Sequence, residues 1–283
     1  MQILFSQYLL NKYKIKANKQ LGQHFIFSQK IISKIIECFD LKKENVVLEI
    51  GAGLGILTQQ VSFLANNVIA VEIDKTFLKI LNDEFKDYSN IEIIEQNILD
   101  LDIVNLFEKY QKKIKVVGNL PYYIANPIIR KMLENRKYIS EIIIMVQAEV
   151  AERIISSPKT KKYGILSISV QYFAKAEILT KISRENFSPK PKVNSALVKI
   201  IPYEKPLFEV KNEDFFFQVI KSAFNKRRKT LLNSLWNSSF LKIDKEKLKE
   251  IILQSEIDPL LRAEAITIQK FVTLSNNLFD FKN

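Results

Sequence analysis

Short apolar runs that alternate with helical segments constrain the fold of this chain more than any other feature. Five runs rich in valine and isoleucine lie at residues 45–50, 67–73, 91–96, 115–118 and 141–147. Helical periodicity fills the intervals, at residues 56–65, 75–86, 102–110 and 126–136. Strands that alternate with helices predict a parallel sheet with right-handed crossovers. Since the runs are apolar on both faces, helices should cover both sides of that sheet.

A helix should also precede the first run, at residues 28–39, with Ser28 as its N-cap. After the fifth run we expect two helices and then two more strands, at 148–156, 163–175, 177–182 and 195–201. The connection between these two strands is too short for a helical crossover, so the pair should be antiparallel.

Beyond Pro202 and Pro206 the pattern is helical only. Helices are expected at 212–224, 228–236, 244–254 and 263–278. The sequence therefore predicts a seven-stranded, Rossmann-like α/β domain over residues 1–205. A small all-helical domain should follow over residues 206–283.

The excess of basic residues bears on binding partners rather than on the fold. The 283 residues include 43 lysines and arginines against 31 aspartates and glutamates, a net charge of +12. Such a charge indicates a polyanion such as nucleic acid, or an anionic membrane surface. The alternative is a lysine-rich surface that is merely solvated. An apolar fraction of 47% is enough for a sizeable core.

The only cysteine, Cys38, and the only histidine, His24, exclude several kinds of site. They allow no internal disulfide and no zinc site with the usual ligands. A Ser-His-Asp or Cys-His catalytic set would have to use one of these two residues. The N-terminal stretch is a poor signal peptide, and no run is long enough to span a membrane. We expect a soluble, cytoplasmic protein with no membrane partner and no metal.

A glycine-rich turn follows the first strand in the stretch "LEIGAGLGILT". Gly51, Gly53 and Gly55 would allow a tight turn and a close approach of the backbone to a ligand. No Lys-Ser or Lys-Thr follows, so this is not the phosphate loop of a nucleotide triphosphatase. A tight turn that binds nothing is the alternative.

Polar residues after the second and third strands favour an adenosine-containing cofactor. Glu72 ends the second strand, where a carboxylate can accept hydrogen bonds from ribose hydroxyls. Asp74 is the expected N-cap of the next helix. Asn97 follows the third strand and could bind an adenine amino group, or it could simply form a turn. These residues do not separate NAD from S-adenosylmethionine.

The stretch "GNLPYY" follows the fourth strand and predicts a clamp for a planar amine. Asn119 offers a carbonyl acceptor, and Pro121 stiffens the loop and pushes Leu120 into an extended conformation. The Leu120 carbonyl is then the second acceptor, and Tyr122 offers a flat face for stacking. We expect the neighbouring Tyr123 to be a packing residue.

Two acceptors on an exocyclic amino group would make its nitrogen a better nucleophile. The lone pair of that nitrogen is normally delocalised into the ring, and hydrogen bonds from both of its hydrogens favour a pyramidal nitrogen. The other contributions to catalysis are positioning of the reactants and electrostatic stabilisation of the charge that develops on nitrogen. Neither needs a histidine or a metal.

Several stretches together resemble the rRNA adenine N6-dimethyltransferase family. They are spread over nearly the whole chain in the expected order and are "LGQHFI", "LEIGAGLGILT", "VEID", "GNLPYYI", "FSPKPKVNSALV", "AFNKRRKTLLNSL" and "DPLLRAE". The resemblance implies a class I methyltransferase fold and S-adenosylmethionine as cofactor. It also implies dimethylation of adenine N6 in ribosomal RNA.

The resemblance also implies roles for individual residues. Expected cofactor contacts are His24, Ile26, Gly51, Gly53, Glu72, Asn97 and Asn119. Expected residues at the reacting base are Asn119, Leu120, Pro121, Tyr122 and Phe187. Expected contacts to RNA phosphates are Lys190, Lys192, Lys226, Arg227, Arg228 and Lys229. His24 stands where many members have asparagine, and Asn97 stands where aspartate is frequent.

Four functions are compatible with this pattern. The leading one is dimethylation of two adjacent adenosines in the 3′-terminal hairpin of 16S rRNA, in the small ribosomal subunit, by a monomer. The stretches "AFNKRRKTLLNSL" and "DPLLRAE" favour it, because they resemble the C-terminal domain of that group. The alternatives are a resistance-type methyltransferase of 23S rRNA, a non-catalytic RNA-binding assembly or transcription factor, and a distant NAD-dependent oxidoreductase.

Overall fold

A computed structural model describes residues 8–15, 24–26, 28–121, 123–226 and 228–282. Tyr122 and Arg227, which the sequence assigns to the site, lie outside the described residues. The chain forms two compact units. The first consists of residues 1–151 and 175–202, and the second of residues 152–174 and 203–283.

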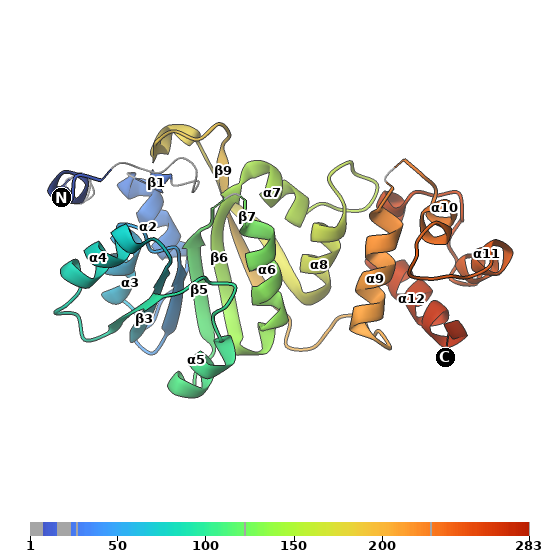
Figure 1. The fold of residues 1–283 in the computed structure, drawn as a ribbon, viewed down its shortest axis with the longest axis horizontal. Helices are drawn as coiled ribbons and strands as arrows, with labels where there is room; N and C mark the ends of the chain where they lie inside the picture. The colour runs from blue at the N-terminus through green and yellow to red at the C-terminus, as the bar shows by residue number, and fades with distance from the viewer. Residues whose placement is uncertain (1–7, 16–23, 27, 122, 227, 283) are drawn as a thin grey trace. The chain divides into compact units, whose positions relative to one another are not determined.

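The first unit is built on the predicted seven-stranded sheet (Figure 1). Its strands are β2 (Val46–Ile50), β3 (Asn67–Glu72), β4 (Ile91–Glu95), β5 (Ile114–Asn119), β6 (Ile139–Gln147), β7 (Ala174–Ile182) and β9 (Ser195–Pro202). Their order is β4-β3-β2-β5-β6-β9-β7. The first five strands pair in parallel, and β9 runs antiparallel to β6. The α/β fold class predicted from the alternating pattern is confirmed.

Helices connect the parallel strands as the periodicity predicts. They are α3 (Ile56–Ser62), α4 (Lys75–Glu84), α5 (Ile103–Tyr110) and α6 (Ala125–Glu134). The helix α2 (Gln29–Cys38) precedes the first of these strands, and α7 (Ala148–Ile154) follows the last. Asp74 caps α4 as expected, since its carboxylate accepts the Thr76 N–H at 2.9 Å. Ser28 occupies the N-cap position of α2, but its side chain makes no capping hydrogen bond.

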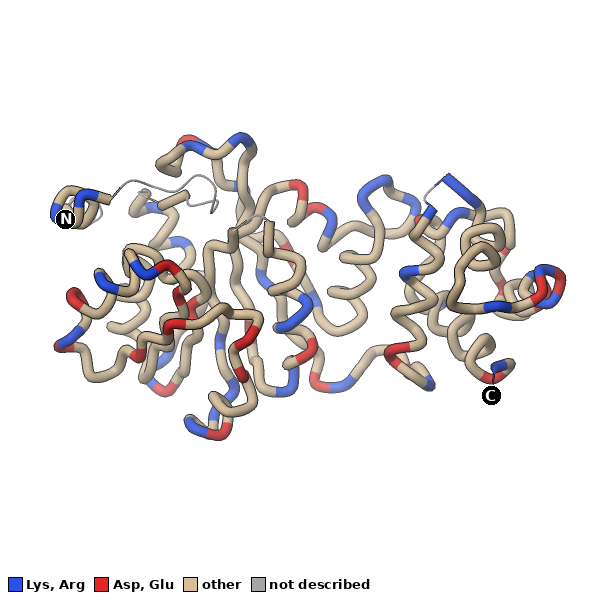
Figure 2. Tube along the Cα trace, viewed as in Figure 1, with Lys and Arg blue, Asp and Glu red and all other residues tan. Residues whose placement is uncertain are grey.

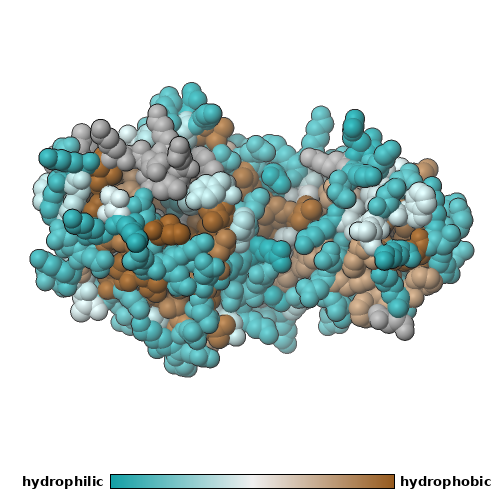
Figure 3. Space-filling view, viewed as in Figure 1, coloured by the Kyte–Doolittle hydropathy of each residue, from teal (hydrophilic) through white to brown (hydrophobic). Residues whose placement is uncertain are grey.

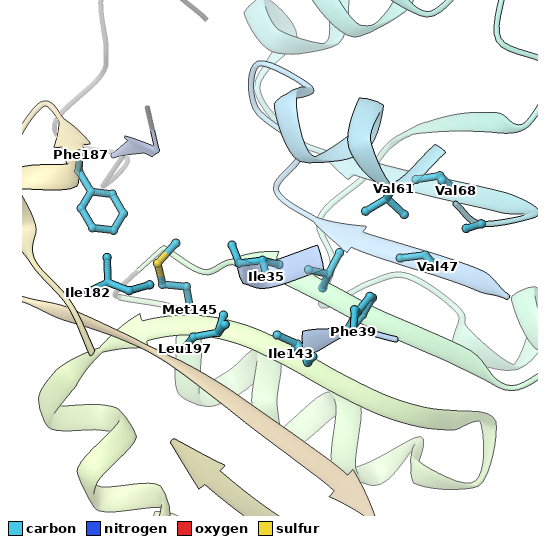
Figure 4. Close-up of a cluster of buried hydrophobic side chains, with 12 residues drawn as sticks. Ile35, Phe39, Val47, Val61, Val68, Ile143, Met145, Ile182, Phe187 and Leu197 are labelled. Atoms are coloured by element: carbon cyan, nitrogen blue, oxygen red, sulfur yellow. The ribbon is translucent and has the colours of Figure 1, made fainter. Parts of the chain in front are cut away.

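Both faces of the sheet are buried. On one face α2 and α3 pack on the strands, where Ile35 and Phe39 lie with Val47 and Met145 in one apolar cluster (Figure 4). On the other face Leu48, Val116 and Ile144 are each at most 1% exposed. Burial on both sides is why the strands are continuous apolar runs rather than alternating ones.

A second, two-stranded sheet was not expected from the sequence. The strand β1 (Phe25–Ile26) pairs antiparallel with β8 (Phe187–Ser188), so that Phe25 faces Ser188 and Ile26 faces Phe187. Each strand has two residues, which is too short to give a periodic signal. This ribbon joins the N-terminal segment to the loop that carries "FSPKPKV".

The second unit is helical. It contains α8 (Ile165–Phe173), α9 (Glu213–Phe224), α10 (Leu231–Trp236), α11 (Lys245–Gln254) and α12 (Ile268–Lys282). The predicted last helix starts at 263, but residues 263–265 form a 3₁₀ turn and α12 begins five residues later. Among the described residues, none of the helices has both the length and the apolar character to cross a membrane.

Aromatic packing explains why residues 152–174 belong to this second unit. The ring of Tyr172 lies 5.0 Å from that of Phe216, and the ring of Phe173 lies 5.5 Å from that of Phe217. These contacts tie α8 to α9. The division predicted at residue 205 places α8 with the sheet instead, because sequence order alone cannot reveal contacts between distant aromatic side chains.

Candidate active site

A cavity of about 380 Å³ opens at the carboxyl ends of β2, β3 and β5 in the first unit. Open α/β sheets bind their ligands at this edge, and the volume is typical of a small-molecule site. The structure brings most of the predicted site residues into its lining: His24, Ile26, Gly51, Gly53, Glu72, Asn97, Asn119, Leu120 and Pro121. In Figure 3, hydrophobic side chains are visible among hydrophilic ones on the face of this unit that is turned to the viewer.

The glycine turn has the left-handed backbone that glycine permits. Gly51, Gly53 and Gly55 have φ angles of 72°, 55° and 74°. The Gly51 N–H donates to the Val71 carbonyl at 2.9 Å, which fastens the turn to the end of β3. Open space surrounds the position that a Cβ of Gly51 would take, so the backbone itself faces the cavity.

The carboxylate of Glu72 is held in place by three backbone donors. One oxygen accepts the Gly53 N–H at 2.9 Å, and the other accepts the N–H groups of Ile73 and Asp74 at 2.8 and 2.9 Å. Two carboxylate oxygens offer about four lone-pair positions, so one remains for a ligand hydroxyl. Glu72 therefore presents an oriented acceptor to the cavity.

A second carboxyl group, Glu49, lines the cavity and was missed by the sequence analysis. It is 3% exposed, and the Thr58 hydroxyl donates to it at 2.6 Å. The pKa of Glu49 is raised to about 8, chiefly by burial: the Thr58 hydrogen bond opposes the rise, and the nearby charge of Glu72 adds a smaller contribution to it. Glu49 is therefore mostly protonated at neutral pH, next to a charged carboxylate.

Asn97 lies in the turn after β4, which lines one end of the cavity. Its side-chain oxygen accepts the Leu99 N–H at 3.0 Å, which is the turn geometry weighed as the alternative reading. A carbonyl oxygen can accept a second hydrogen bond, so the ligand role stays a prediction. Ile73 and Ile98 also line the cavity, and their apolar side chains suit the two faces of a planar base.

The "GNLPYY" loop is anchored at both ends. The Leu120 N–H donates to the Met145 carbonyl at 3.0 Å, and the Ile124 N–H donates to the Pro121 carbonyl at 3.1 Å, just before α6 begins. The Leu120 side chain is buried, which leaves the loop backbone on the cavity side. Tyr123 is 67% exposed and lines the cavity, so its prediction as a packing residue is wrong.

Asn119 is oriented by the N-terminal segment. Its side-chain nitrogen donates to the His24 backbone carbonyl at 2.9 Å. A backbone carbonyl can only accept, so the amide nitrogen must face His24 and the amide oxygen must face away from it. The amide oxygen, which is the acceptor predicted from the sequence, therefore points away from His24.

Phe187 lies outside the cavity lining. Its ring is 5% exposed and packs near Ile182 and Met145 (Figure 4). Contact with a base would require a shift of the segment that carries this ring. Its role at the target base is a prediction that the structure does not test.

The predicted RNA-contacting residues fall into two groups, one in each unit. In the first unit, Lys190 pairs with Glu185 at 2.5 Å on the exposed loop after β8. In the second unit, Lys226, Arg228 and Lys229 lie in the exposed connection between α9 and α10, among the blue segments of Figure 2. Each group gives its unit a basic surface segment.

Comparison with known proteins decides between NAD and S-adenosylmethionine as cofactor, and between the reactions that each would support. Residues 14–278 match the family described as ribosomal RNA adenine dimethylase. The chain belongs to the ribosomal RNA adenine dimethylase family. A relative from Halothermothrix orenii, named ribosomal RNA small subunit methyltransferase A, is 42% identical over 96% of this chain and 91% of its own length.

Solved structures agree with this assignment. A dimethyladenosine transferase from Plasmodium falciparum superposes with a TM-score of 0.77 at 26% identity, covering 92% of this chain and 98% of that one. The 23S rRNA methyltransferase ErmE, at 23% identity and a TM-score of 0.67 over 90% of this chain and 99% of that one, shares the fold.

Membership of the ribosomal RNA adenine dimethylase family accounts for the chemistry of the cavity. The reaction is transfer of methyl groups to adenine in ribosomal RNA, and it needs a methyl donor of the S-adenosylmethionine type. The cavity fits such a donor, because it combines an oriented carboxylate, an open glycine backbone and apolar walls. The distant NAD-dependent alternative is excluded by the family.

Proposed function

We propose that this chain uses S-adenosylmethionine to dimethylate N6 of two adjacent adenosines in the 3′-terminal hairpin of 16S rRNA. The observation that carries the proposal is the orientation of Asn119. Its amide nitrogen is engaged by the His24 carbonyl, which leaves its oxygen as an acceptor at the edge of the cavity. An acceptor at that edge suits a donor such as an exocyclic amino group.

Different residues of the cavity would bind different parts of the cofactor. Glu72 would accept hydrogen bonds from the ribose hydroxyls, and Asn97 would accept one from the adenine amino group. Gly51 and Gly53 would let the methionine part approach the backbone, and His24 and Ile26 would cover it. When bound, the cofactor supplies an electrophilic methyl group on a positively charged sulfur.

The protein's part in the reaction is to hold the target amino group. The Asn119 oxygen and the Leu120 carbonyl would each accept one hydrogen of the adenine N6. Pro121 would keep the two acceptors at a constant separation, and Tyr122 would stack on the base. These contacts localise the lone pair on N6 and stabilise the positive charge that develops there.

RNA binding would rest on the basic segments. Lys190 and Lys192 lie close in sequence to Phe187, so they would bind phosphates beside the target base. Lys226, Arg227, Arg228 and Lys229 would bind phosphates of the same RNA from the second unit. We propose the small ribosomal subunit as substrate, and a cytoplasmic monomer as the active form, because the relatives that match over nearly the whole chain carry a small-subunit name.

The deciding experiment is methyl transfer from labelled S-adenosylmethionine to small ribosomal subunits that lack the modification, followed by nucleoside analysis. We expect N6,N6-dimethyladenosine in 16S rRNA. Label in large-subunit RNA would select the resistance-type activity instead. Binding to the subunit without any transfer would select the non-catalytic alternative.

Asn119 gives the sharpest test of the clamp. Asn119→Ala removes one acceptor, and we expect kcat to fall by at least about 100-fold, the usual effect of removing one preorganised contact to a developing charge. Binding of 16S rRNA should change by less than about threefold, because the phosphate contacts remain. Gly164→Ala is a suitable control, since open space surrounds its Cβ position and it does not line the cavity. Wild-type turnover in Asn119→Ala would refute the acceptor role.

A further inference from the structure

Three segments that are far apart in the sequence meet at His24. Its backbone carbonyl accepts the Asn119 side-chain N–H at 2.9 Å, and its ring Nδ1 lies 2.6 Å from the Pro189 carbonyl. The next two residues, Phe25 and Ile26, form the ribbon with Phe187 and Ser188. One residue thus touches both the acceptor at the cavity and the loop that follows the ribbon.

The contact with Pro189 fixes the hydrogen on the ring. A backbone carbonyl has no hydrogen to give, so Nδ1 of His24 must carry the hydrogen and donate it. The ring is therefore held in the orientation that points Nδ1 at the Pro189 carbonyl.

We propose that His24 is a positioning residue for the transfer reaction, which locks the Asn119 amide so that its oxygen, not its nitrogen, faces the target amino group. This inference rests on the proposed function. The amide of an asparagine can turn over and exchange its oxygen and nitrogen, and a turned Asn119 would present N–H groups to the hydrogens of N6. The His24 carbonyl accepts only the correct orientation, and the ring anchors that carbonyl to Pro189.

The geometry identifies a matched pair of variants. The side-chain nitrogen of asparagine has the same number of bonds from Cα as Nδ1 of histidine, so His24→Asn keeps a donor opposite the Pro189 carbonyl. The nitrogen of glutamine is one bond further out and corresponds to Nε2, so His24→Gln moves that donor away. His24→Ala removes it. All three variants keep the backbone carbonyl and the pairing of β1 with β8.

The experiment measures single-turnover methyl transfer and binding of S-adenosylhomocysteine for the wild-type chain and the three variants. We expect His24→Ala and His24→Gln to lower the transfer rate at saturating substrates about tenfold, because small misplacements of reacting groups are costly. His24→Asn should stay within about threefold of wild type. Because His24 also lines the cofactor cavity, His24→Ala and His24→Gln should weaken S-adenosylhomocysteine binding as well, and transfer is therefore compared at saturating cofactor.

Three results would overturn the inference. The first is an unchanged transfer rate in both His24→Ala and His24→Gln. The second is a loss in His24→Asn as large as in His24→Ala. The third is a loss confined to cofactor affinity, which would make His24 only a cofactor contact. Failure of the proposed function would be visible separately, as absence of transfer by the wild-type chain.

Hydrogen–deuterium exchange gives a second readout that does not depend on turnover. The amide hydrogens of residues 118–124 should exchange faster in His24→Ala and His24→Gln than in the wild type, and unchanged in His24→Asn. Equal exchange in all four proteins would contradict a lock between His24 and the loop, whatever the substrate is.

Discussion

Gly51 and Gly55 have almost the same left-handed backbone but very different surroundings. A Cβ on Gly51 would meet no atom within 4 Å, whereas one on Gly55 would lie 2.8 Å from Cζ of Phe85 and 2.9 Å from Cδ2 of Leu81. Gly51 lines the cavity and Gly55 does not. The two glycines therefore serve different purposes, ligand approach at Gly51 and packing of α4 at Gly55.

Alanine substitutions should separate these purposes. Gly55→Ala should lower the free energy of unfolding by about 2–4 kcal/mol, since left-handed strain adds to overpacking. Gly51→Ala should cost only about 1–2 kcal/mol, but it should weaken cofactor binding about tenfold. Denaturant unfolding and calorimetric titration with S-adenosylhomocysteine would measure both. Equal stability losses would contradict the packing role of Gly55.

Glu49 makes a prediction about pH. Because burial raises its pKa to about 8, the folded chain holds a proton that the unfolded chain releases above its ordinary pKa near 4.5. This contribution to stability is complete below about pH 4.5 and is lost as the pH rises toward 8, at up to about 1.4 kcal/mol per pH unit.

Glu49→Gln should remove that dependence, because an amide does not titrate yet can still accept the Thr58 hydroxyl. The comparison is the free energy of unfolding of wild type and Glu49→Gln at pH 5, 6.5 and 8. The free energy of unfolding of Glu49→Gln should increase relative to that of the wild type as the pH rises. Parallel pH profiles of the two proteins would show that Glu49 is not buried as a neutral group.

Among the elements, α2 is held by a group of charges around the buried Glu141. Glu141 on β6 pairs with Lys115 on β5 at 3.1 Å and with Lys199 on β9. Lys115 also donates to the Phe39 carbonyl at 2.8 Å, at the end of α2. The positive charge there is favourable to the carboxyl end of the helix. The group fastens α2 to three neighbouring strands.

Breaking this group should be costly. Glu141→Gln leaves two lysines partly buried without their carboxylate, and the free energy of unfolding should fall by about 3 kcal/mol. Glu134→Gln is the matched control, because Glu134 forms an exposed pair with Arg130 at 2.7 Å in the same unit. That loss should stay below about 1 kcal/mol. Similar losses in the two variants, measured by denaturant unfolding, would argue against a stabilising role for the group around Glu141.

For the whole molecule, the net charge of +12 favours RNA binding, and the number of phosphates contacted sets its salt dependence. If Lys226 and Lys229 each bind one phosphate, removing either should lower the slope of log affinity against log salt by about one unit. Lys247 is a suitable control, because it pairs with Glu250 at 2.8 Å on α11. Lys247→Ala should leave the slope unchanged. Filter binding to 16S rRNA from 50 to 300 mM salt would measure it, and equal slopes in all variants would contradict the phosphate contacts.

Local patterns in the sequence were sufficient for most of the fold. The apolar runs at 45–50 and 67–73 became β2 and β3 because strand formation between buried faces depends on residues that are neighbours in the chain. The glycine turn and Glu72 were placed correctly for the same reason, since the ends of parallel strands fall on one edge of the sheet. The family resemblance added the reaction.

Contacts between distant residues could be decided only by the tertiary structure. The ribbon of β1 and β8 joins residues more than 160 positions apart, and the lock of His24 on Asn119 joins residues 95 positions apart. Neither contact leaves a periodic pattern in the sequence. The burial of Glu49 and the aromatic contacts that tie α8 to α9 leave none either. The sequence determined which residues could do the chemistry, through local pattern and residue type. Their orientation was decided by long-range packing and hydrogen bonds, which exist only once the chain has folded.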